Sequence, residues 1–342
     1  MVSYQNILQA RDNIAGHVAE TELVDKGHGE DGSETYLKLE HKHAGVGAFK
    51  KRGACNALVE AVNDGRFEEA ISKGDISEVV TAAIGSHGFA IGHFCRGSKN
   101  LSSTCYMPDG APSGKKITME RAVDNVVYVD GDFRQTEEAA KQYADNKGHL
   151  FIHPYNDERV IAGQGTIGLE IYDQLPDVAN VYVPVGGGGL ISGIAIALKE
   201  LKPDVRIVGV QSENMHAMAE SFKQGRITEV PQATSFAEPL CVNLNPEAIT
   251  FGYVNELVDE FMLVGDGLIR YTQHDLYGHD LAVEGAATIA LAAAEDDPNR
   301  EGKSVCIVTG QHYNNSDFFG IMCSAVEALI KSEEKLRDGW VV

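Results

Sequence analysis

The chain has 342 residues, of which 43% are hydrophobic and 23% charged, a composition typical of a globular protein with one large or two medium domains. Its formal net charge of −21 disfavours binding to nucleic acids or anionic membranes, because acidic surfaces repel phosphate groups. The N-terminus lacks the basic and apolar pattern of a signal peptide, and the longest apolar stretch, around residues 286–294, is too short to span a bilayer. We therefore expect a cytoplasmic protein with no nucleic-acid or membrane partner.

The periodicity of the first half predicts a small α/β unit that follows an N-terminal helical region. Helix and strand patterns alternate, which favours an α/β fold over one with segregated helices and strands. A series of strand–helix steps begins near residue 78 and closes near residue 155, and its crossovers should be right-handed. The expected elements are a helix at 3–20, a strand at 36–40, a helix at 53–63, a strand at 79–83, a helix at 87–96, a strand at 103–107, a helix near 115–122, a strand at 126–129, a helix at 135–146 and a return near residue 150.

The second half continues the alternation and completes a larger unit. Its expected elements are a strand at 181–184, helix 190–201, strand 206–211, helix 215–224, helices near 250–258 and 283–294, and strand 304–309. With boundaries near residues 80 and 155, we predict a discontinuous large domain of residues 1–80 plus 156–342 and a small α/β domain of residues 81–155.

The six cysteines include no CxxC pair, and Cys55, Cys306 and Cys323 lie within apolar patterns. Buried free thiols in a reducing cytoplasm fit this pattern better than a disulfide framework or a zinc site. We expect the chain to hold neither.

Two adjacent lysines, Lys50 and Lys51, stand between glycines where an extended stretch gives way to a helical one. A lysine at such a junction can direct its amine into a cleft and serve as a covalent handle for a carbonyl cofactor. Paired lysines at helix starts are usually solvated, however. The residues alone decide neither between a solvated pair and a cofactor-binding lysine nor between Lys50 and Lys51.

Four glycines in a row, residues 186–189, stand between an apolar strand and a helix start. Glycines let backbone amides converge on an anion, and the helix N-terminus adds a partial positive charge. A dinucleotide fingerprint would need a glycine at Ser192 and an acidic residue near Gln211, and no nucleoside triphosphate loop is present. The run therefore predicts a site for a single phosphate on a small cofactor.

Three further segments carry polar groups near helix or strand ends. Residues 81–88 (Thr-Ala-Ala-Ile-Gly-Ser-His-Gly) form a strand-to-helix turn whose amides suit a carboxylate, although Ser86 as a plain helix cap is the alternative. Residues 161–170 read most simply as a glycine-rich loop entering a helix. Strand 304–309 ends at Thr309, and hydroxyls at strand ends in α/β folds often face the ligand crevice.

Taken in chain order, these segments resemble motifs of the pyridoxal-phosphate-dependent threonine dehydratases and serine racemases. The matches are residues 49–54 to S-F-K-x-R-G-A, residues 83–88 to S-S-G-N-H-G, residues 160–170 to a nearly identical family stretch, residues 184–190 to the phosphate loop, and residues 284–287 with 309–310 to the late motifs. The resemblance implies an α/β fold of the tryptophan-synthase-β type, fold type II, with twisted, mostly parallel sheets flanked by helices. It also implies pyridoxal 5'-phosphate between two domains, and a homodimer.

The resemblance also assigns roles to individual residues. It makes Lys50 the Schiff-base lysine and Thr309 the partner of the pyridine nitrogen, where a neutral hydroxyl should leave that nitrogen largely unprotonated and favour β-elimination. The other cofactor-binding residues that it implies are Phe49, Ser86, Gly186, Gly187, Gly188 and Gly189. The residues that it implies for the substrate carboxylate are Ile84, Gly85, Ser86 and His87.

Several positions depart from the family pattern. Ile84 stands where racemases carry a serine that reprotonates Cα, and an alkyl side chain cannot donate a proton, so efficient racemisation is not expected. Ser86 replaces an asparagine whose amide usually contacts the cofactor. Gln211 and Ala217 replace a Glu and an Asp that bind a divalent cation in some members, so we expect no metal. In the late motif, Gln311 and His312 replace Gly-Asn.

These features together predict a pyridoxal-phosphate-dependent ammonia-lyase that converts L-threonine or L-serine into a 2-oxo acid and ammonia by α,β-elimination. Lys50 would take the Cα proton as general base, which requires burial or a nearby cation to lower its pKa. The alternatives are a 3-hydroxyaspartate dehydratase or an amino-acid racemase of the same family, and a non-catalytic protein that binds the cofactor.

Overall fold

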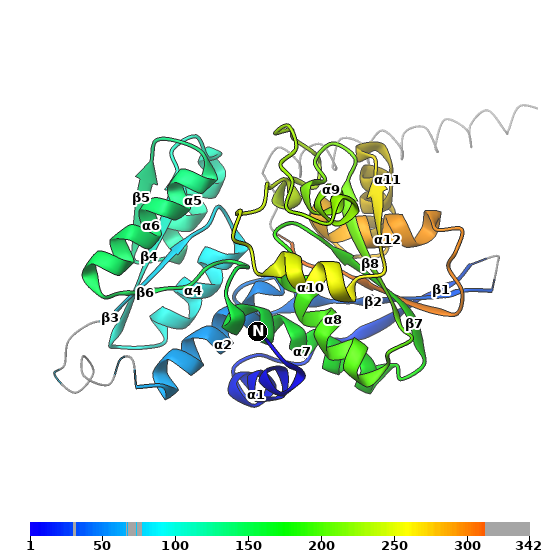
Figure 1. Ribbon diagram of the computed structural model, residues 1–342, viewed down its shortest axis with the longest axis horizontal. Coiled ribbons are helices and arrows are strands. Elements are labelled where there is room, and N and C mark those ends of the chain that lie inside the picture. The colour runs from blue at the N-terminus through cyan, green and yellow to red at the C-terminus, as the bar shows by residue number, and fades with distance from the viewer. Residues whose placement is uncertain (30–31, 66, 68–72, 74–76, 312–342) are drawn as a thin grey trace, which may run out of the picture.

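The computed structural model describes residues 1–29, 32–65, 67, 73 and 77–311, which form two lobes side by side (Figure 1). One lobe surrounds a six-stranded sheet and the other surrounds a four-stranded sheet. The chain visits the larger lobe first, crosses to the smaller lobe, and then returns. The α/β class predicted from the alternating periodicities is confirmed.

The larger sheet has the strand order β1-β2-β10-β7-β8-β9. β1 pairs with β2 antiparallel, and every other pairing is parallel. Its strands are β1 (Leu23–His28), β2 (Glu34–Lys38), β7 (Val178–Pro184), β8 (Arg206–Ser212), β9 (Glu260–Val264) and β10 (Lys303–Ile307). Because both faces are covered, the central strands β7, β8 and β10 are buried at nearly every position rather than at alternate ones.

Helices cover both faces of this sheet. In β7, Val181 and Val183 pack into a core shared with α7 and α8, while Tyr182 between them packs into a core shared with α11 and α12. The helices of this lobe are α1 (Tyr4–Ile14), α7 (Glu158–Gln174), α8 (Gly189–Leu201), α9 (Ala217–Gln224), α10 (Thr250–Leu257), α11 (Asp266–Gly278) and α12 (Gly285–Asp296), with 3₁₀ turns η1 (Glu40–Lys42) and η2 (Glu238–Leu240). A further helix, α2 (Lys50–Asn63), contacts both lobes.

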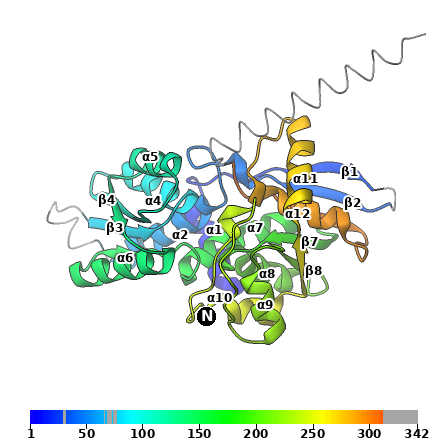
Figure 2. The ribbon, with the colours of Figure 1, turned by 90° about the horizontal axis from the view of Figure 1, so that it is seen from above.

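The smaller sheet is parallel throughout, in the order β5-β4-β3-β6. Its strands are β3 (Ser77–Ala82), β4 (Leu101–Pro108), β5 (Asn125–Val129) and β6 (Leu150–Phe151), and its helices are α4 (Ser86–Arg96), α5 (Ser113–Ala122) and α6 (Phe133–Lys147). Viewed from above, α2 lies between the lobes, and it packs against both α7 and α4 (Figure 2). The predicted division into residues 1–80 plus 156–342 and 81–155 stays a prediction.

Most predicted elements are present, with differences at their ends and at the sheet edges. The helix predicted over residues 3–20 ends at Ile14, because the chain turns through Gly16 in a left-handed conformation with φ of 79°. The helix predicted from Gly53 begins at Lys50. The strands β1 and β9 and the helix α11 were not predicted. Both of these strands lie at edges of the sheet and are only partly buried. β1 has no alternating apolar pattern, and the apolar run of β9 is too short for periodicity to distinguish a strand from a helix.

The prediction of a glycine-rich loop at residues 161–170 is wrong, because this stretch lies inside the long helix α7. Its glycines permit close helix packing instead. A Cβ on Gly163 would lie 2.7 Å from the Cα of Gly53 in α2, and a Cβ on Gly165 would lie 3.0 Å from the carbonyl oxygen of Gly193 in α8. Glycine in a helix interior costs about 0.5–1 kcal/mol relative to alanine, and here close contact with two neighbouring helices offsets that cost.

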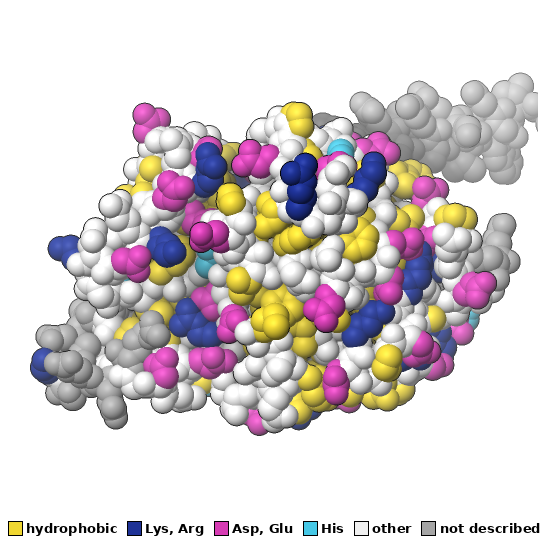
Figure 3. All heavy atoms as spheres, viewed as in Figure 1, with side chains coloured by type: hydrophobic (Ala, Val, Ile, Leu, Met, Phe, Trp, Pro, Cys, Tyr) yellow, Lys and Arg dark blue, Asp and Glu magenta, His cyan; other side chains and the backbone are white. Residues whose placement is uncertain are grey.

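The distribution of surface charge and the lengths of the helices are relevant to binding of nucleic acids and membranes. On the face shown in Figure 3, acidic side chains are spread among basic ones rather than separated into patches of one sign. In the described ranges, no helix combines the length and the apolar composition that crossing a membrane requires.

Replacing Gly163 with alanine should destabilise the protein by about 1–3 kcal/mol, because the new methyl group meets backbone atoms of α2 that cannot move aside. Gly252 in α10 is the matched control, since a Cβ there meets nothing within 4 Å. Gly252→Ala should be neutral or stabilising by about 0.5–1 kcal/mol. Urea denaturation of both variants measures the difference, and equal midpoints would contradict the close α2–α7 contact.

Candidate active site

A cavity of about 500 Å³ opens between the lobes and is lined by residues of both. The chain reaches it where parallel strands of the two sheets end: after β3 in the smaller sheet, and after β7 and β10 in the larger one. Crevices at the carboxyl ends of parallel strands are the usual ligand sites of α/β folds. All the predicted site residues line this cavity: Phe49, Lys50, Ile84, Gly85, Ser86, His87, Gly186, Gly187, Gly188, Gly189 and Thr309.

The structure distinguishes the two adjacent lysines. Lys50, the first residue of α2, lines the cavity, and its Nζ donates a hydrogen bond to the carbonyl oxygen of Pro154 at 2.5 Å. Burial lowers the pKa of Lys50 to about 8. Lys51 does not line the cavity, and its Nζ donates to the carbonyl oxygen of Ala44 at 2.9 Å. Of the two adjacent lysines, it is therefore Lys50 that offers its amine to a molecule in the cavity.

Backbone contacts tie the start of α2 to the segment after β10. Ala48 pairs with Gly310 in an isolated antiparallel bridge, and the Phe49 amide donates to the carbonyl oxygen of Thr309 at 3.1 Å. The Lys50 Nζ lies 5.1 Å from the centre of the Phe49 ring. Phe49, Lys50 and Thr309 are thus held together on one wall of the cavity.

The four-glycine run leads from β7 into α8, with its N-cap residue Gly188 in a left-handed conformation at φ of 87°. No side chain caps this helix start. A Cβ on Gly187 would come within 2.4 Å of the Tyr155 ring, and one on Gly188 within 2.6 Å of the Met218 Cε. Side chains are therefore excluded here. An uncapped helix N-terminus built from glycines is a favourable site for a phosphate.

A second helix start, that of α4, faces the same cavity. Its N-cap is Gly85 and it has no side-chain cap, so the alternative interpretation of Ser86 as the cap is wrong. His87 is buried, its Nε2 lies 3.3 Å from the carbonyl oxygen of Ile152, and its Nδ1 has no hydrogen-bond partner. Burial, aided by the charge of Lys50, lowers the pKa of His87 well below its usual value, so its ring is neutral.

Sequence reasoning missed three charged groups that line the cavity. Glu284 belongs to a motif that was noted, but its burial was not visible in the sequence; burial raises its pKa to about 7. Lys115 of α5 and Glu238 of η2 meet from opposite lobes, with 2.7 Å between the Lys115 Nζ and a Glu238 carboxylate oxygen. No local pattern identifies this pair, because the partners are far apart in the sequence.

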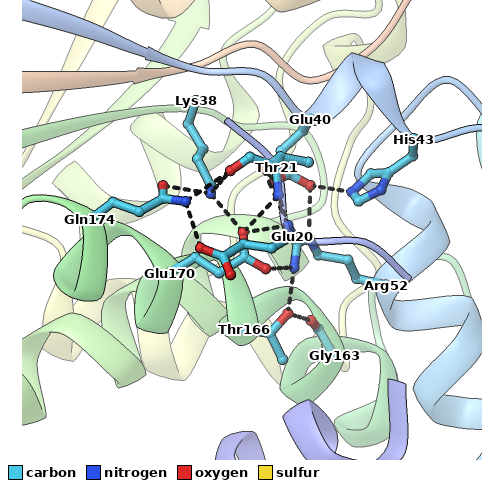
Figure 4. Close-up of polar contacts among 10 residues, drawn as sticks. All are labelled: Glu20, Thr21, Lys38, Glu40, His43, Arg52, Gly163, Thr166, Glu170 and Gln174. Carbon is cyan, nitrogen blue, oxygen red and sulfur yellow. Dashed lines mark hydrogen bonds and ion pairs between the residues drawn. The ribbon is translucent and has the colours of Figure 1, made fainter. Parts of the chain in front are cut away.

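A buried ion cluster holds the helix that carries Lys50 (Figure 4). Arg52 donates to both oxygens of Glu40, at 2.8 Å each, and to both oxygens of Glu170, at 2.5 and 2.8 Å. The Lys38 Nζ adds a bond to Glu170 at 2.6 Å. Burial by itself raises the pKa of Glu40, but the Arg52 charge and the bonds from His43 and Arg52 outweigh it, and the pKa lies below its usual range. The cluster joins α2 to β2, η1 and α7.

Gln211 and Ala217 stand where some members of the resembling family carry a Glu and an Asp that bind a divalent cation. The Gln211 side chain donates to the carbonyl oxygen of Val185 at 3.0 Å and accepts from the amide of Ala219 at 2.8 Å. It thereby links the residue before the glycine run to the start of α9. Within the described part of the chain, no group of three or more His, Cys, Asp or Glu residues is arranged to hold a metal ion. The absence of a bound metal stays a prediction.

Two residues of the late motif, Gln311 and His312, differ from the family pattern, and the structure describes the first of them. Gln311 lies next to the cavity wall, where its amide donates to the carbonyl oxygen of Gly47 at 3.1 Å. His312 lies outside the described residues.

These residues fit a carbonyl cofactor that carries one phosphate. Lys50 presents an amine of lowered pKa, and the glycine run presents an uncapped helix start. His87 lines the same cavity, and its buried Nδ1 has no hydrogen-bond partner. A volume of about 500 Å³ is within the range of small-molecule sites. Pyridoxal phosphate has the aldehyde and the phosphate that this arrangement suits.

Comparisons with known proteins agree with this chemistry. The family model for pyridoxal-phosphate dependent enzymes matches residues 14–310. The L-threonine ammonia-lyase of Geobacter sulfurreducens is 37% identical over 315 residues, which cover 91% of this chain and 75% of that protein. The catabolic L-threonine dehydratase TdcB of Escherichia coli is 36% identical over 317 residues, which cover 90% of this chain and 92% of that protein.

A solved structure supports the same fold. Maize serine racemase superposes with a TM-score of 0.81 at 26% identity, and the match covers 96% of this chain and 98% of that one. The fold class predicted from the motifs, that of the tryptophan-synthase-β type, is confirmed by this similarity together with the family match.

Removing the Arg52 guanidinium should be strongly destabilising, because Glu40 and Glu170 would keep their burial and lose their shared partner. For Arg52→Met we expect a loss of about 3–5 kcal/mol in the free energy of unfolding, measured by urea denaturation. Arg52→Lys should recover only part of the loss, since an ammonium cannot bond two carboxylates in parallel. A loss below about 1 kcal/mol in Arg52→Met would show that the cluster contributes little.

The lowered pKa of Lys50 predicts a specific pH dependence in the cofactor-free protein. Only the neutral amine reacts with an acylating reagent, so labelling of Lys50 should rise through a midpoint near pH 8. Exposed lysines should label with a midpoint near their ordinary value of about 10.4. Mass spectrometry of the peptide that contains residue 50 measures the profile, and a midpoint above pH 10 would contradict the burial of this amine.

Proposed function

The chain belongs to the family of pyridoxal-phosphate-dependent enzymes, and we propose that it is an ammonia-lyase that converts L-threonine or L-serine into a 2-oxo acid and ammonia by α,β-elimination. One observation carries the proposal: the Lys50 amine and the uncapped start of α8 face the same cavity. The similarity to the threonine ammonia-lyase and to the threonine dehydratase supports the reaction type.

In this proposal, Lys50 holds the cofactor and moves the proton. Pyridoxal phosphate, when bound, supplies an electron-withdrawing ring that acidifies the Cα–H of the amino acid joined to it. Lys50, set free by the substrate amine, takes the Cα proton onto Nζ. A pKa of about 8 leaves a useful fraction of this amine neutral near physiological pH. The β-hydroxyl gains one proton and departs as water, and the Cα proton taken up by Lys50 balances this step. One water then hydrolyses the released enamine to the 2-oxo acid and ammonia.

The two helix starts bind the two anionic groups. Gly186–Gly189 would hold the cofactor phosphate, where the N-terminus of α8 contributes a partial positive charge. The start of α4, around Gly85 and Ser86, would hold the substrate carboxylate in the same way. Phe49 lies beside the Lys50 amine, and Thr309 would meet the pyridine nitrogen with a neutral hydroxyl.

The other activities considered from the sequence have less support. Racemisation needs a proton donor on the face of Cα opposite Lys50, and Ile84, which lines the cavity, has none. The similarity to maize serine racemase is a similarity of fold at 26% identity. A non-catalytic role is not favoured, because the amine and the anion site needed for catalysis occur together.

A cytoplasmic location and a homodimer are further parts of this proposal. Four described cysteines, Cys55, Cys95, Cys105 and Cys306, are buried free thiols, which agrees with a reducing compartment. Cys323 lies outside the described residues. The homodimer rests on the resemblance to the family.

Replacing Lys50 with alanine should abolish release of 2-oxo acid and ammonia from L-threonine and L-serine, because no other amine reaches the cavity from α2. The matched control is Lys51→Ala, which removes the adjacent amine that bonds to Ala44 instead. The control should keep most of the wild-type turnover, measured as 2-oxo acid formed per enzyme. Near-native turnover in Lys50→Ala, or equal losses in both variants, would contradict the assigned role.

A further inference from the structure

A salt bridge crosses the cavity from one lobe to the other. Lys115 of α5 donates from Nζ to both carboxylate oxygens of Glu238 in η2, at 2.7 and 2.8 Å. Both residues line the cavity that contains Lys50. The Lys115 side chain is only 16% exposed, so its charge is directed at Glu238 rather than at solvent.

A second carboxyl group lies in the same electrostatic neighbourhood. Glu284 also lines the cavity, and its amide donates to the carbonyl oxygen of Gly310, next to Thr309. Burial is the largest effect on the pKa of Glu284 and raises it. The charge of Lys115 acts in the opposite direction, and the charge of Glu238 raises the pKa further. These three charged groups therefore act on one another across the cavity.

The balance of charge in the cavity is the decisive feature. Among the described residues that line it, the cationic side chains are Lys50 and Lys115, and the acidic ones are Glu238 and Glu284. In the proposed reaction Lys50 is committed to the cofactor and to the Cα proton. Lys115 is the remaining cation, and Glu238 already neutralises it with two hydrogen bonds.

We propose that the Lys115–Glu238 pair is a specificity determinant that restricts the substrate to β-hydroxy amino acids with one carboxylate and excludes 3-hydroxyaspartate. This inference rests on the proposed function and names its substrate class. 3-Hydroxyaspartate has the same amine, Cα–H, α-carboxylate and β-hydroxyl as threonine, so the bonds that break are the same. The two substrates differ in the β-substituent, which is a methyl group in threonine and a carboxylate in 3-hydroxyaspartate.

Among the described residues that line the cavity, no cation is free to receive that second carboxylate. To bond to Lys115, it must compete with Glu238, which brings two carboxylates to one ammonium group. Like charges brought together at a site disfavour the wrong ligand strongly, and this repulsion acts on binding rather than on the chemical step. The methyl group of threonine requires no such exchange of partners.

The test is a change in substrate preference in the holoenzyme of Glu238→Gln. This variant keeps the side-chain shape, removes the negative charge, and frees the charge of Lys115 for a second carboxylate. The ratio of kcat/KM for L-threo-3-hydroxyaspartate to that for L-threonine should rise about tenfold or more, mainly through a lower KM for 3-hydroxyaspartate. A tenfold change corresponds to about 1.4 kcal/mol. The ratio is taken within one preparation, so a partly unfolded variant does not distort it.

Two further variants complete the experiment. Adding Lys115→Ala to Glu238→Gln should remove the gain, because the freed cation is then absent. Asp109→Asn is the matched control: Asp109 pairs at 2.8 Å with Lys116, the neighbour of Lys115 in α5, and neither residue lines the cavity. It should leave the ratio unchanged.

The outcomes separate this inference from the function on which it rests. A wild-type enzyme that uses 3-hydroxyaspartate as well as threonine overturns the inference. So does a Glu238→Gln variant that loses activity equally on both substrates, which is the result expected if the pair only joins the lobes. If the wild-type holoenzyme forms no 2-oxo acid from threonine, serine or 3-hydroxyaspartate, the proposed function fails, and the assigned specificity fails with it.

Discussion

The guanidinium of Arg52, buried between the carboxylates of Glu40 and Glu170, is the interaction on which the site depends. A buried charge is unfavourable unless every donor finds a partner, and here two carboxylates receive the planar group in parallel. The arrangement fixes the first turn of α2 against η1 and α7. Lys50 lies in that same turn, so the position of its amine follows from the position of Arg52.

Close helix packing makes this cluster possible. Gly53 of α2 and Gly163 of α7 let the two backbones approach, and Arg52 then lies within reach of Glu170, about two turns further along the same face of α7. A larger residue at either glycine would separate the helices and lengthen the Arg52 bonds. Small residues on the helices and charged residues between them therefore form one structural unit, and the cavity wall is built on it.

Burial also sets the protonation of the groups around the cavity. It lowers the pKa of Lys50 to about 8, lowers that of His87 and raises that of Glu284 to about 7. In each case the low-dielectric surroundings disfavour the charged form. The Lys115–Glu238 ion pair adds two hydrogen bonds across the same cavity. The cavity thus combines an amine suited to proton transfer, two helix starts suited to anions, and a neutralised cation.

The sequence by itself determined the alternating α/β architecture and, through the order of its motifs, the family to which the chain belongs; it also predicted an anion site at Gly186–Gly189. These features are local: backbone periodicity, glycine runs and short motifs are written in neighbouring residues. Only the tertiary structure placed residues 161–170 inside a helix and brought Lys115 to Glu238. Those outcomes depend on which side chains meet when distant segments pack. Local pattern does not encode such contacts, because each is decided by the shape and charge of a partner elsewhere in the chain.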